Sequence, residues 1–178
     1  MELTLESRLF NSMALITLFI LVFNIPFNYF SGLQTTALIF ACLTLIISGL
    51  YYLSRFRNQV TISIVIASFF VIILFATNYF FSGGIHGATF LSLMLAFVLI
   101  TIVSPKRLYV LWLALSLLVG IGLLWVEYSH PEVVRVSYGS REALFIDIAF
   151  TYGTGVLVSF FSVFYLKEAY KGEKRSAD

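Results

Sequence analysis

The residues best suited to chemistry in this chain are polar side chains near the ends of long apolar segments. They are Asn24, Asn28, Asn78, His86, Glu127, His130, Glu132, Arg135, Arg141, Glu142 and Asp147. Imidazoles and carboxylates can bind a divalent metal, an arginine can hold a carboxylate or phosphate through two hydrogen bonds, and histidines titrate near neutral pH. The set therefore leaves open a metal site, an anion site, a proton sensor and an ordinary wet loop capped by salt bridges.

The spacing of these residues argues against a resident metal or cofactor. It matches no known ligand motif, and the chain has no HExxH or CxxC motif and no glycine-rich phosphate loop between a strand and a helix. No lysine lies within an apolar segment to form a retinal-type Schiff base, and Cys42 is the lone cysteine. No base, nucleophile and stabilising group occur together. We therefore expect no catalytic residue, no metal and no cofactor, and hence not an enzyme.

Asp147 has the most informative position of these candidates. It lies a few residues inside the last apolar segment, about 6 Å below Ala143 along a helix. Thr151 and Thr154 follow at helical spacing and share its face. An ionisable residue inside a membrane helix is costly and marks a candidate functional site. The alternative is that Asp147 reaches up to water or pairs with Arg141.

Two other polar stretches admit both a structural and a functional interpretation. Asn24 and Asn28 are one helical turn apart and flank Pro26, which frees a backbone carbonyl. They predict either a local kink or a polar notch in the outer half of a bundle. His86 lies within residues 83–87, where three glycines predict a tight turn. This turn is either a simple connection or a support that holds His86 at the bundle mouth.

The composition predicts that these residues belong to a membrane protein. Hydrophobic residues make up 60% of the 178 and charged residues 11%, whereas a soluble domain is about 25% charged. A membrane-spanning helix needs roughly 20 apolar residues. The predicted spans are 9–30, 34–53, 60–81, 86–103, 108–126 and 143–166.

The lysines and arginines predict the orientation of these spans. When the loops are assigned alternately to two sides, nine basic residues fall on one side and two on the other. The nine are Arg8, Arg55, Arg57, Lys106, Arg107, Lys167, Lys171, Lys174 and Arg175, and the two are Arg135 and Arg141. The positive-inside rule then places both termini in the cytoplasm. We expect an all-α, polytopic protein of the inner (plasma) membrane, with six transmembrane helices as three hairpins in an N-in/C-in topology.

A weak internal repeat supports the three hairpins. Three arginines lie 49 and 50 residues apart, and a similar polar–tyrosine pair follows each. The arginines are Arg8, Arg57 and Arg107, and the pairs are Asn28–Tyr29, Asn78–Tyr79 and Glu127–Tyr128. Bilayer thickness alone can produce such a period. The shared residues favour three similar tips, of which the third is enlarged and contains His130.

Six stretches together resemble a known bacterial module. They are residues 8–11 (RLFN), 25–28 (IPFN), 51–55 (YYLSR), 81–87 (FSGGIHG), 104–106 (SPK) and 140–147 (SREALFID). The chain resembles the six-helix N-terminal membrane domain of bacterial sensor histidine kinases, especially those common in Bacteroidetes, which belong to two-component systems.

In receptors of this family the last helix leaves the membrane and enters a dimerising signalling helix. The resemblance therefore implies a homodimer formed through the C-terminal helix, with residues 167–178 as a cytoplasmic helix extension and tail. No phospho-acceptor, ATP-binding or cyclase sequence follows in the printed chain, which indicates either a sensory half or a stand-alone relative.

We accordingly expect a single six-span domain that acts as a sensory, signal-transducing module. An unknown small ligand or a proton would act at the outer polar residues, and the last helix would relay the change, with Arg141, Glu142 and Asp147 as coupling residues. Besides this stimulus, the expected partner is membrane lipid, with no nucleic acid. Two alternatives remain open: a small transporter or channel with its polar site at the outer end of the bundle, and a scaffold subunit of a larger complex.

Overall fold

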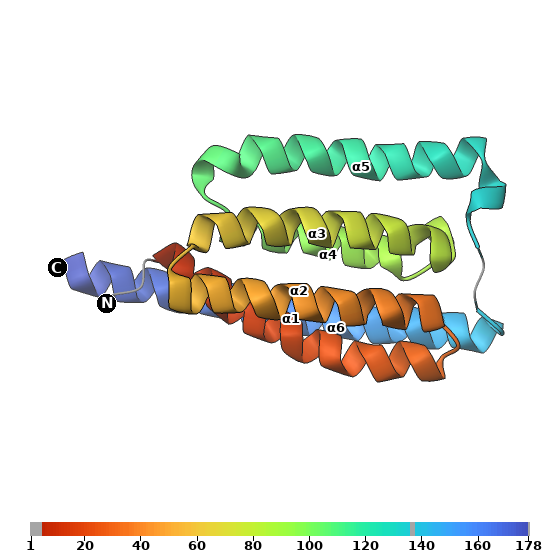
Figure 1. The fold of residues 1–178 in the computed structure, drawn as a ribbon, viewed down its shortest axis with the longest axis horizontal. Helices are drawn as coiled ribbons and strands as arrows, with labels where there is room; N and C mark the ends of the chain where they lie inside the picture. The colour runs from red at the N-terminus through yellow and green to blue at the C-terminus, as the bar shows by residue number, and fades with distance from the viewer. Residues whose placement is uncertain (1–4, 136–137, 178) are drawn as a thin grey trace.

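The structure, a computed structural model, describes the backbone of residues 5–135 and 138–177 and the side chains of 7–135 and 138–168. All regular structure in these residues is helical (Figure 1). Six α-helices are present: α1 (Leu5–Phe30), α2 (Gln34–Arg57), α3 (Val60–Phe81), α4 (Thr89–Val103), α5 (Tyr109–Ser129) and α6 (Arg141–Ala177). Three short 3-10 helices accompany them: η1 (Gly84–His86), η2 (Lys106–Leu108) and η3 (Pro131–Val133). The expected all-α class is confirmed.

The helices end at residues whose backbone leaves the α-helical conformation. Asn58 follows α2 in the left-handed conformation, with φ of 57°, and its N–H bonds back to the Leu53 carbonyl. Gly83 and Gly84 follow α3 with φ of 86° and 60°, which glycine adopts without steric cost. After α4, Ser104 is extended before Pro105, as the residue preceding a proline prefers.

Five of the six helices are long and apolar enough to cross a membrane, and α4 is shorter. With 15 residues, α4 is about 22 Å long, compared with a hydrocarbon core of about 30 Å. Within the expected fourth span, 86–103, the α-helix covers Thr89–Val103. The helix starts only at Thr89 because η1 and the turn around it occupy the preceding residues.

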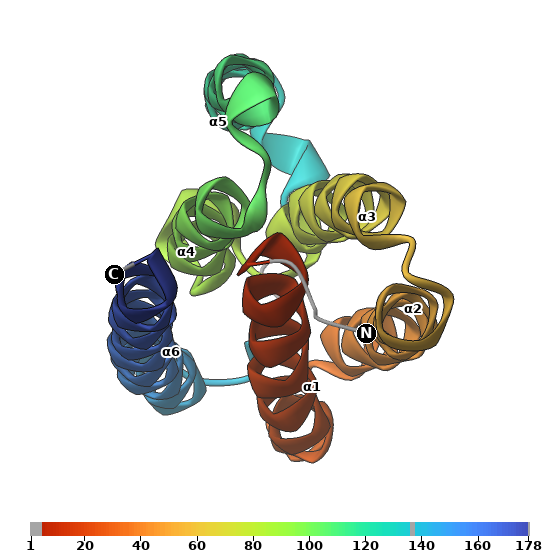
Figure 2. The same cartoon turned by 90° about the vertical axis from the view of Figure 1, so that its left-hand side faces the viewer.

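The helices form an open bundle whose two ends differ. The connections 31–33 and 82–88, and residues 130–135 and 138–140 of the next one, lie at one end, here called the loop end (Figure 1). The connections 58–59 and 104–108 lie at the other, here called the basic end, and both chain ends lie on that side (Figure 1). Viewed from the basic end, α1, α2, α3, α4 and α6 surround a common interior, whereas α5 lies outside against α3 and α4 (Figure 2).

Of the three expected hairpins, the first two are packed helix pairs, whereas α5 and α6 of the third pack on other helices. α1 packs on α2 and α3 packs on α4, but α6 packs on α1 and α4 instead of α5. Short turns force consecutive helices to be neighbours. More residues connect α5 to α6, and the two helices lie on different sides of the bundle (Figure 2).

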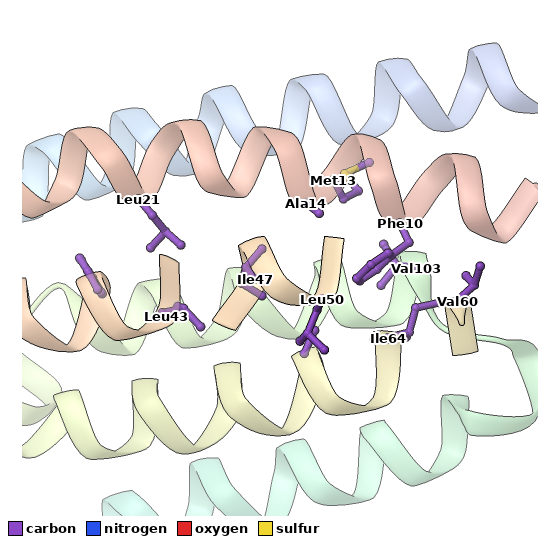
Figure 3. Packing of buried hydrophobic residues seen from close by; sticks show 12 residues of the cluster. Phe10, Met13, Ala14, Leu21, Leu43, Ile47, Leu50, Val60, Ile64 and Val103 are labelled. Atoms are coloured by element: carbon purple, nitrogen blue, oxygen red, sulfur yellow. The ribbon is translucent and has the colours of Figure 1, made fainter. Parts of the chain in front are cut away.

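The main apolar core lies among α1, α2 and α3 and includes Val103 from the end of α4 (Figure 3). Ile64 is fully buried there, and Leu43 is nearly so. The outward faces of α5 and α6 instead carry exposed large apolar side chains, such as Leu113 and Phe160. Such faces suit a lipid environment, in which hydrocarbon is the solvent.

Candidate functional site

A central cavity of about 580 Å³ lies among α1, α2, α3, α4 and α6. It extends along α1 from Phe10 to Asn28, which corresponds to about 27 Å of helix. Its volume is within the range of about 300–1,000 Å³ that is common for small-molecule sites. Among the described residues, none of α5 lines it.

The two ends of the cavity differ in chemistry. Towards the basic end the walls are mainly apolar, with Phe10, Met13, Ile47, Ile64 and Val103. Towards the loop end, side chains with hydroxyl, amide or carboxyl groups line it: Asn24, Asn28, Thr36, Asn78, Ser82, Thr89, Ser92, Asp147 and Thr151. The cavity is therefore amphipathic along its length.

Asn78 anchors one polar wall and joins three helices. Its side chain is only 1% exposed. The side-chain oxygen accepts a hydrogen bond of 2.8 Å from the Thr36 hydroxyl, and the amide nitrogen donates one of 2.8 Å to the Thr89 hydroxyl. Ser82 bonds both the Asn78 carbonyl and the Thr89 hydroxyl. These bonds connect α2, α3 and the start of α4, which gives Asn78 a structural role in the cavity wall.

Asn24 and Asn28 contribute hydrogen-bond acceptors to the cavity. Their amide nitrogens donate to the carbonyls of Ile20 and Asn24 at 2.9 and 2.8 Å. These bonds fix the orientation of each amide, because a side-chain carbonyl cannot donate to a backbone carbonyl. One N–H of each amide is thus used within α1, and the side-chain oxygens remain as acceptors on a helix face that lines the cavity.

Asp147 is buried at the loop end of the cavity, with an exposed fraction of 6%. Thr151 and Thr154 line the same cavity, as their helical spacing predicts. The Asp147 carboxylate accepts a hydrogen bond from the Tyr138 hydroxyl. The alternative in which Asp147 reaches water or pairs with Arg141 is therefore wrong for the described residues, since Arg141 lies exposed at the start of α6.

Arg135 and Tyr138, in the connection before α6, lie against the end of α3 and the turn 82–88 that follows it. The Arg135 N–H donates to the Phe80 carbonyl at 2.8 Å, and the Arg135 guanidinium lies 5.5 Å from the centre of the Phe81 ring. The Tyr138 ring packs beside Gly83, where an added Cβ would lie 3.4 Å from it. The sequence analysis missed Tyr138. The one sequence feature that could have indicated its role is its position nine residues before Asp147.

Glu127 lies outside the cavity and attaches α5 to the tip between α3 and α4. Its carboxylate accepts hydrogen bonds from the Tyr79 hydroxyl and, at 3.1 Å, from the Ile85 N–H. A Cβ on Gly84 would lie 2.6 Å from a Glu127 oxygen, so the close approach requires glycine there. We call these contacts of Glu127 with Tyr79 and Ile85 the clamp, because they hold the end of α5 against the turn between α3 and α4.

The remaining candidates are exposed and do not converge on the cavity. His86 lies on η1, and Arg141 and Glu142 lie on the first turn of α6. His130 pairs with Glu132 at 3.2 Å, both largely exposed. A backbone hydrogen bond, followed by the contact with His130, lowers the pKa of Glu132. Within the described residues, no three His, Cys, Asp or Glu side chains come close enough to hold a metal ion.

The contact between Tyr138 and Asp147 predicts a distinctive pH dependence of stability. Burial, followed by the hydrogen bond and negative charge of Asp147, raises the pKa of Tyr138 above its ordinary value of 10.0, although a backbone hydrogen bond with Ala88 opposes this. Above pH 10 the unfolded chain loses this proton before the folded chain does, so the stabilisation declines as pH rises. The difference in melting temperature between wild type and Tyr138→Phe should therefore shrink from pH 8 to pH 11.

Thermal unfolding across that range, in one detergent, measures this difference. All other residues are the same in the two proteins, so the comparison isolates the Tyr138 hydroxyl. A difference that stays constant or grows above pH 10 would contradict the role of the Tyr138 hydroxyl.

A scan of protein-family models found none that matches the chain, and searches of curated proteins and of solved structures found no match either. The described residues form an all-helical structure, and the five helices that are long and apolar enough to cross a bilayer suggest a membrane protein.

Proposed function

We propose that the chain is a sensory module of the bacterial inner membrane that relays a stimulus through α6 to a cytoplasmic output. One observation supports this most strongly. Asp147 lines the cavity, and the helix that carries it continues without a break to Ala177, beyond its apolar span of Arg141–Glu168. A change in what the Asp147 carboxylate contacts can therefore shift a rigid element that leaves the bundle.

The packing of α6 is suited to such a shift. It contacts α1 and α4, and few of its described side chains are buried: Asp147, Val158 and Ser162. Ser162 meets Met13 of α1 at 3.3 Å. A ligand that binds one position of α6 more tightly than another will shift the population between them.

The distribution of charge supports the proposed orientation. Arg8, Arg55, Arg57, Lys106 and Arg107 lie at the basic end, which the positive-inside rule assigns to the cytoplasm. This distribution supports the proposal that both termini lie in the cytoplasm. The resemblance to sensor histidine kinase membrane domains implies, in addition, a homodimer through the C-terminal helix. The output domain would receive α6 beyond Ala177.

A chimera tests this proposal. We would fuse residues 1–178 to the dimeric cytoplasmic part of a histidine kinase and measure phosphorylation of its response regulator in membranes. Asp147→Asn removes the charge that receives the Tyr138 hydrogen bond, so the basal output should change several-fold in either direction. Glu142→Gln makes the same chemical change at an exposed position of the same helix, outside the cavity, and should change the output less than Asp147→Asn does. Equal outputs from all three proteins at matched membrane levels would refute the relay through Asp147.

A second candidate function, transport, is favoured by the length of the cavity. Its extent of about 27 Å along α1 approaches the thickness of the hydrocarbon core, about 30 Å. Proteoliposomes containing a pH-sensitive dye would detect proton flux. Flux above that of protein-free vesicles, abolished in Asp147→Asn, would favour a transporter over the sensor.

A further inference from the structure

We propose that the cavity binds a lipid-like molecule whose headgroup donates hydrogen bonds and carries no negative charge, such as a long-chain alcohol or amine. We infer that this molecule enters from the bilayer between α4 and α6. The inference names the ligand class for the cavity of the proposed sensor, and so it rests on that proposal for its biological meaning.

The polar end of the cavity selects the headgroup. Asp147 and the side-chain oxygens of Asn24 and Asn28 present acceptors there, and one of the two N–H groups of each asparagine amide is already used within α1. Among the described lining residues there is no lysine, arginine or histidine. A phosphate or carboxylate headgroup would meet a carboxylate without a compensating cation, which is strongly unfavourable at low dielectric constant. A hydroxyl or ammonium group finds acceptors.

The apolar part of the cavity accommodates a chain but does not by itself hold it. Side chains such as Leu43, Ile47 and Ile64 line this part. Moving an alkyl chain from lipid to this wall gains little, because lipid tails are as apolar as leucine. The headgroup contacts must therefore provide most of the affinity, and ligands of equal chain length should differ strongly.

The side chains between α4 and α6 show where the cavity reaches the surface. Met94 and Val98 on α4, and Tyr152 and Val156 on α6, line the cavity and are nevertheless 59%, 55%, 64% and 51% exposed. Gly155 of α6 lies beside the Leu95 side chain of α4, since an added Cβ would be 3.7 Å from it. In a membrane these residues face the acyl chains, so the opening is lateral.

Binding of three matched probes tests the proposal. Tritiated tetradecan-1-ol, tetradecylamine and tetradecanoate would be titrated against the full chain in phosphatidylcholine nanodiscs, with empty nanodiscs correcting for partition into lipid. Saturable binding is expected for the alcohol or the amine, and at least about tenfold weaker binding for tetradecanoate. Saturable tetradecanoate binding of equal affinity, or no saturable binding of any probe, would overturn the headgroup assignment.

Glycine variants test the location of the site. Gly155→Leu fills the cavity and should weaken probe binding at least tenfold, whereas Gly153→Leu, at an exposed position two residues earlier, should not. Met94→Trp at the exposed opening provides a second obstruction if Gly155→Leu does not fold. Equal binding by the wild type, the folded obstructing variant and Gly153→Leu would overturn the lateral site.

The two proposals fail in different ways. If Gly155→Leu changes the output of the chimera but neither donor probe binds, the ligand class is wrong and the sensor stands. If a donor probe binds the wild type but not Gly155→Leu, and Asp147→Asn leaves the output unchanged, the ligand class stands and the sensor is wrong.

Discussion

Gly87→Ala is expected to disrupt the tip between α3 and α4 and to lower the stability of the whole bundle. An alanine Cβ at this position would lie 1.7 Å from the Ser82 carbonyl oxygen and 2.8 Å from its carbonyl carbon. Both are backbone atoms, so relief requires the turn itself to change. We expect a loss of at least about 3 kcal/mol, at the upper end of the usual range for single substitutions.

This turn has so large an effect because other contacts depend on it. It positions Thr89, whose hydroxyl receives the Asn78 amide, and Ile85, whose N–H reaches Glu127. It also supports the Tyr138 ring beside Gly83. A changed turn therefore weakens the cavity wall, the attachment of α5 and the contact with Asp147 together.

Thermal unfolding followed by tryptophan fluorescence would measure the effect, since Trp112 is 1% exposed in the folded chain. At about 2–4 °C per kcal/mol for a chain of this size, the melting temperature should fall by roughly 6–12 °C. Gly49→Ala is the matched control, because no atom lies within 4 Å of its added Cβ. Equal melting temperatures for Gly87→Ala and Gly49→Ala would show that the tip does not limit stability.

Local sequence patterns predict where most of the helices lie in the chain, but not which helices pack against each other. Apolar length and basic flanks predict the bounds of α2 and α3 closely, because both effects act on single segments. Residues 83–87 predict a tight turn for the same reason. The path of α6 across the bundle depends on how a long connection folds over a distant tip, and no periodicity encodes that.

The candidate site shows the same limit. The position of Asp147 inside an apolar helix and its shared face with Thr151 were predictable from helical geometry. Two features were not. The donor to Asp147 is Tyr138, in the connection before α6, and Glu127 faces away from the cavity towards Tyr79. Both contacts join residues of different segments, which local patterns do not predict. The predicted polar cluster therefore separates into a cavity site, a clamp and several exposed residues.

That clamp leads to the second large effect, a strong energetic coupling between Glu127 and Tyr79. Tyr79 is fully buried, and its hydroxyl donates to the Glu127 carboxylate. Glu127→Ala leaves this hydroxyl and the Ile85 N–H without their acceptor. Hydrogen bonds to charged groups contribute about 1.5–3 kcal/mol each, and an unpaired buried donor costs about 1–3 kcal/mol. We therefore expect Glu127→Ala to lower the unfolding free energy by about 2–4 kcal/mol.

A double-mutant cycle separates the contact from its surroundings. Tyr79→Phe alone should be destabilising, but in the Glu127→Ala background it should cost little or restore stability, because it removes the unpaired hydroxyl. The expected coupling energy is about 1–3 kcal/mol, measured by denaturant or thermal unfolding of the four proteins. Glu132→Ala, at an exposed glutamate that pairs with His130, should remain within about 0.5 kcal/mol of wild type. Additive effects of the two clamp substitutions would contradict the pairing.

The clamp variants also distinguish the role of α5 from that of the cavity. None of the described α5 residues lines the cavity, and among them the buried apolar side chains are Trp112 and Leu123. Glu127→Ala should therefore loosen α5 while the folded protein still binds the alcohol or amine probe with wild-type affinity. A parallel loss of probe binding below the unfolding temperature would mean that α5 holds the α3–α4 tip, and through Tyr138 the Asp147 carboxylate, in the binding geometry.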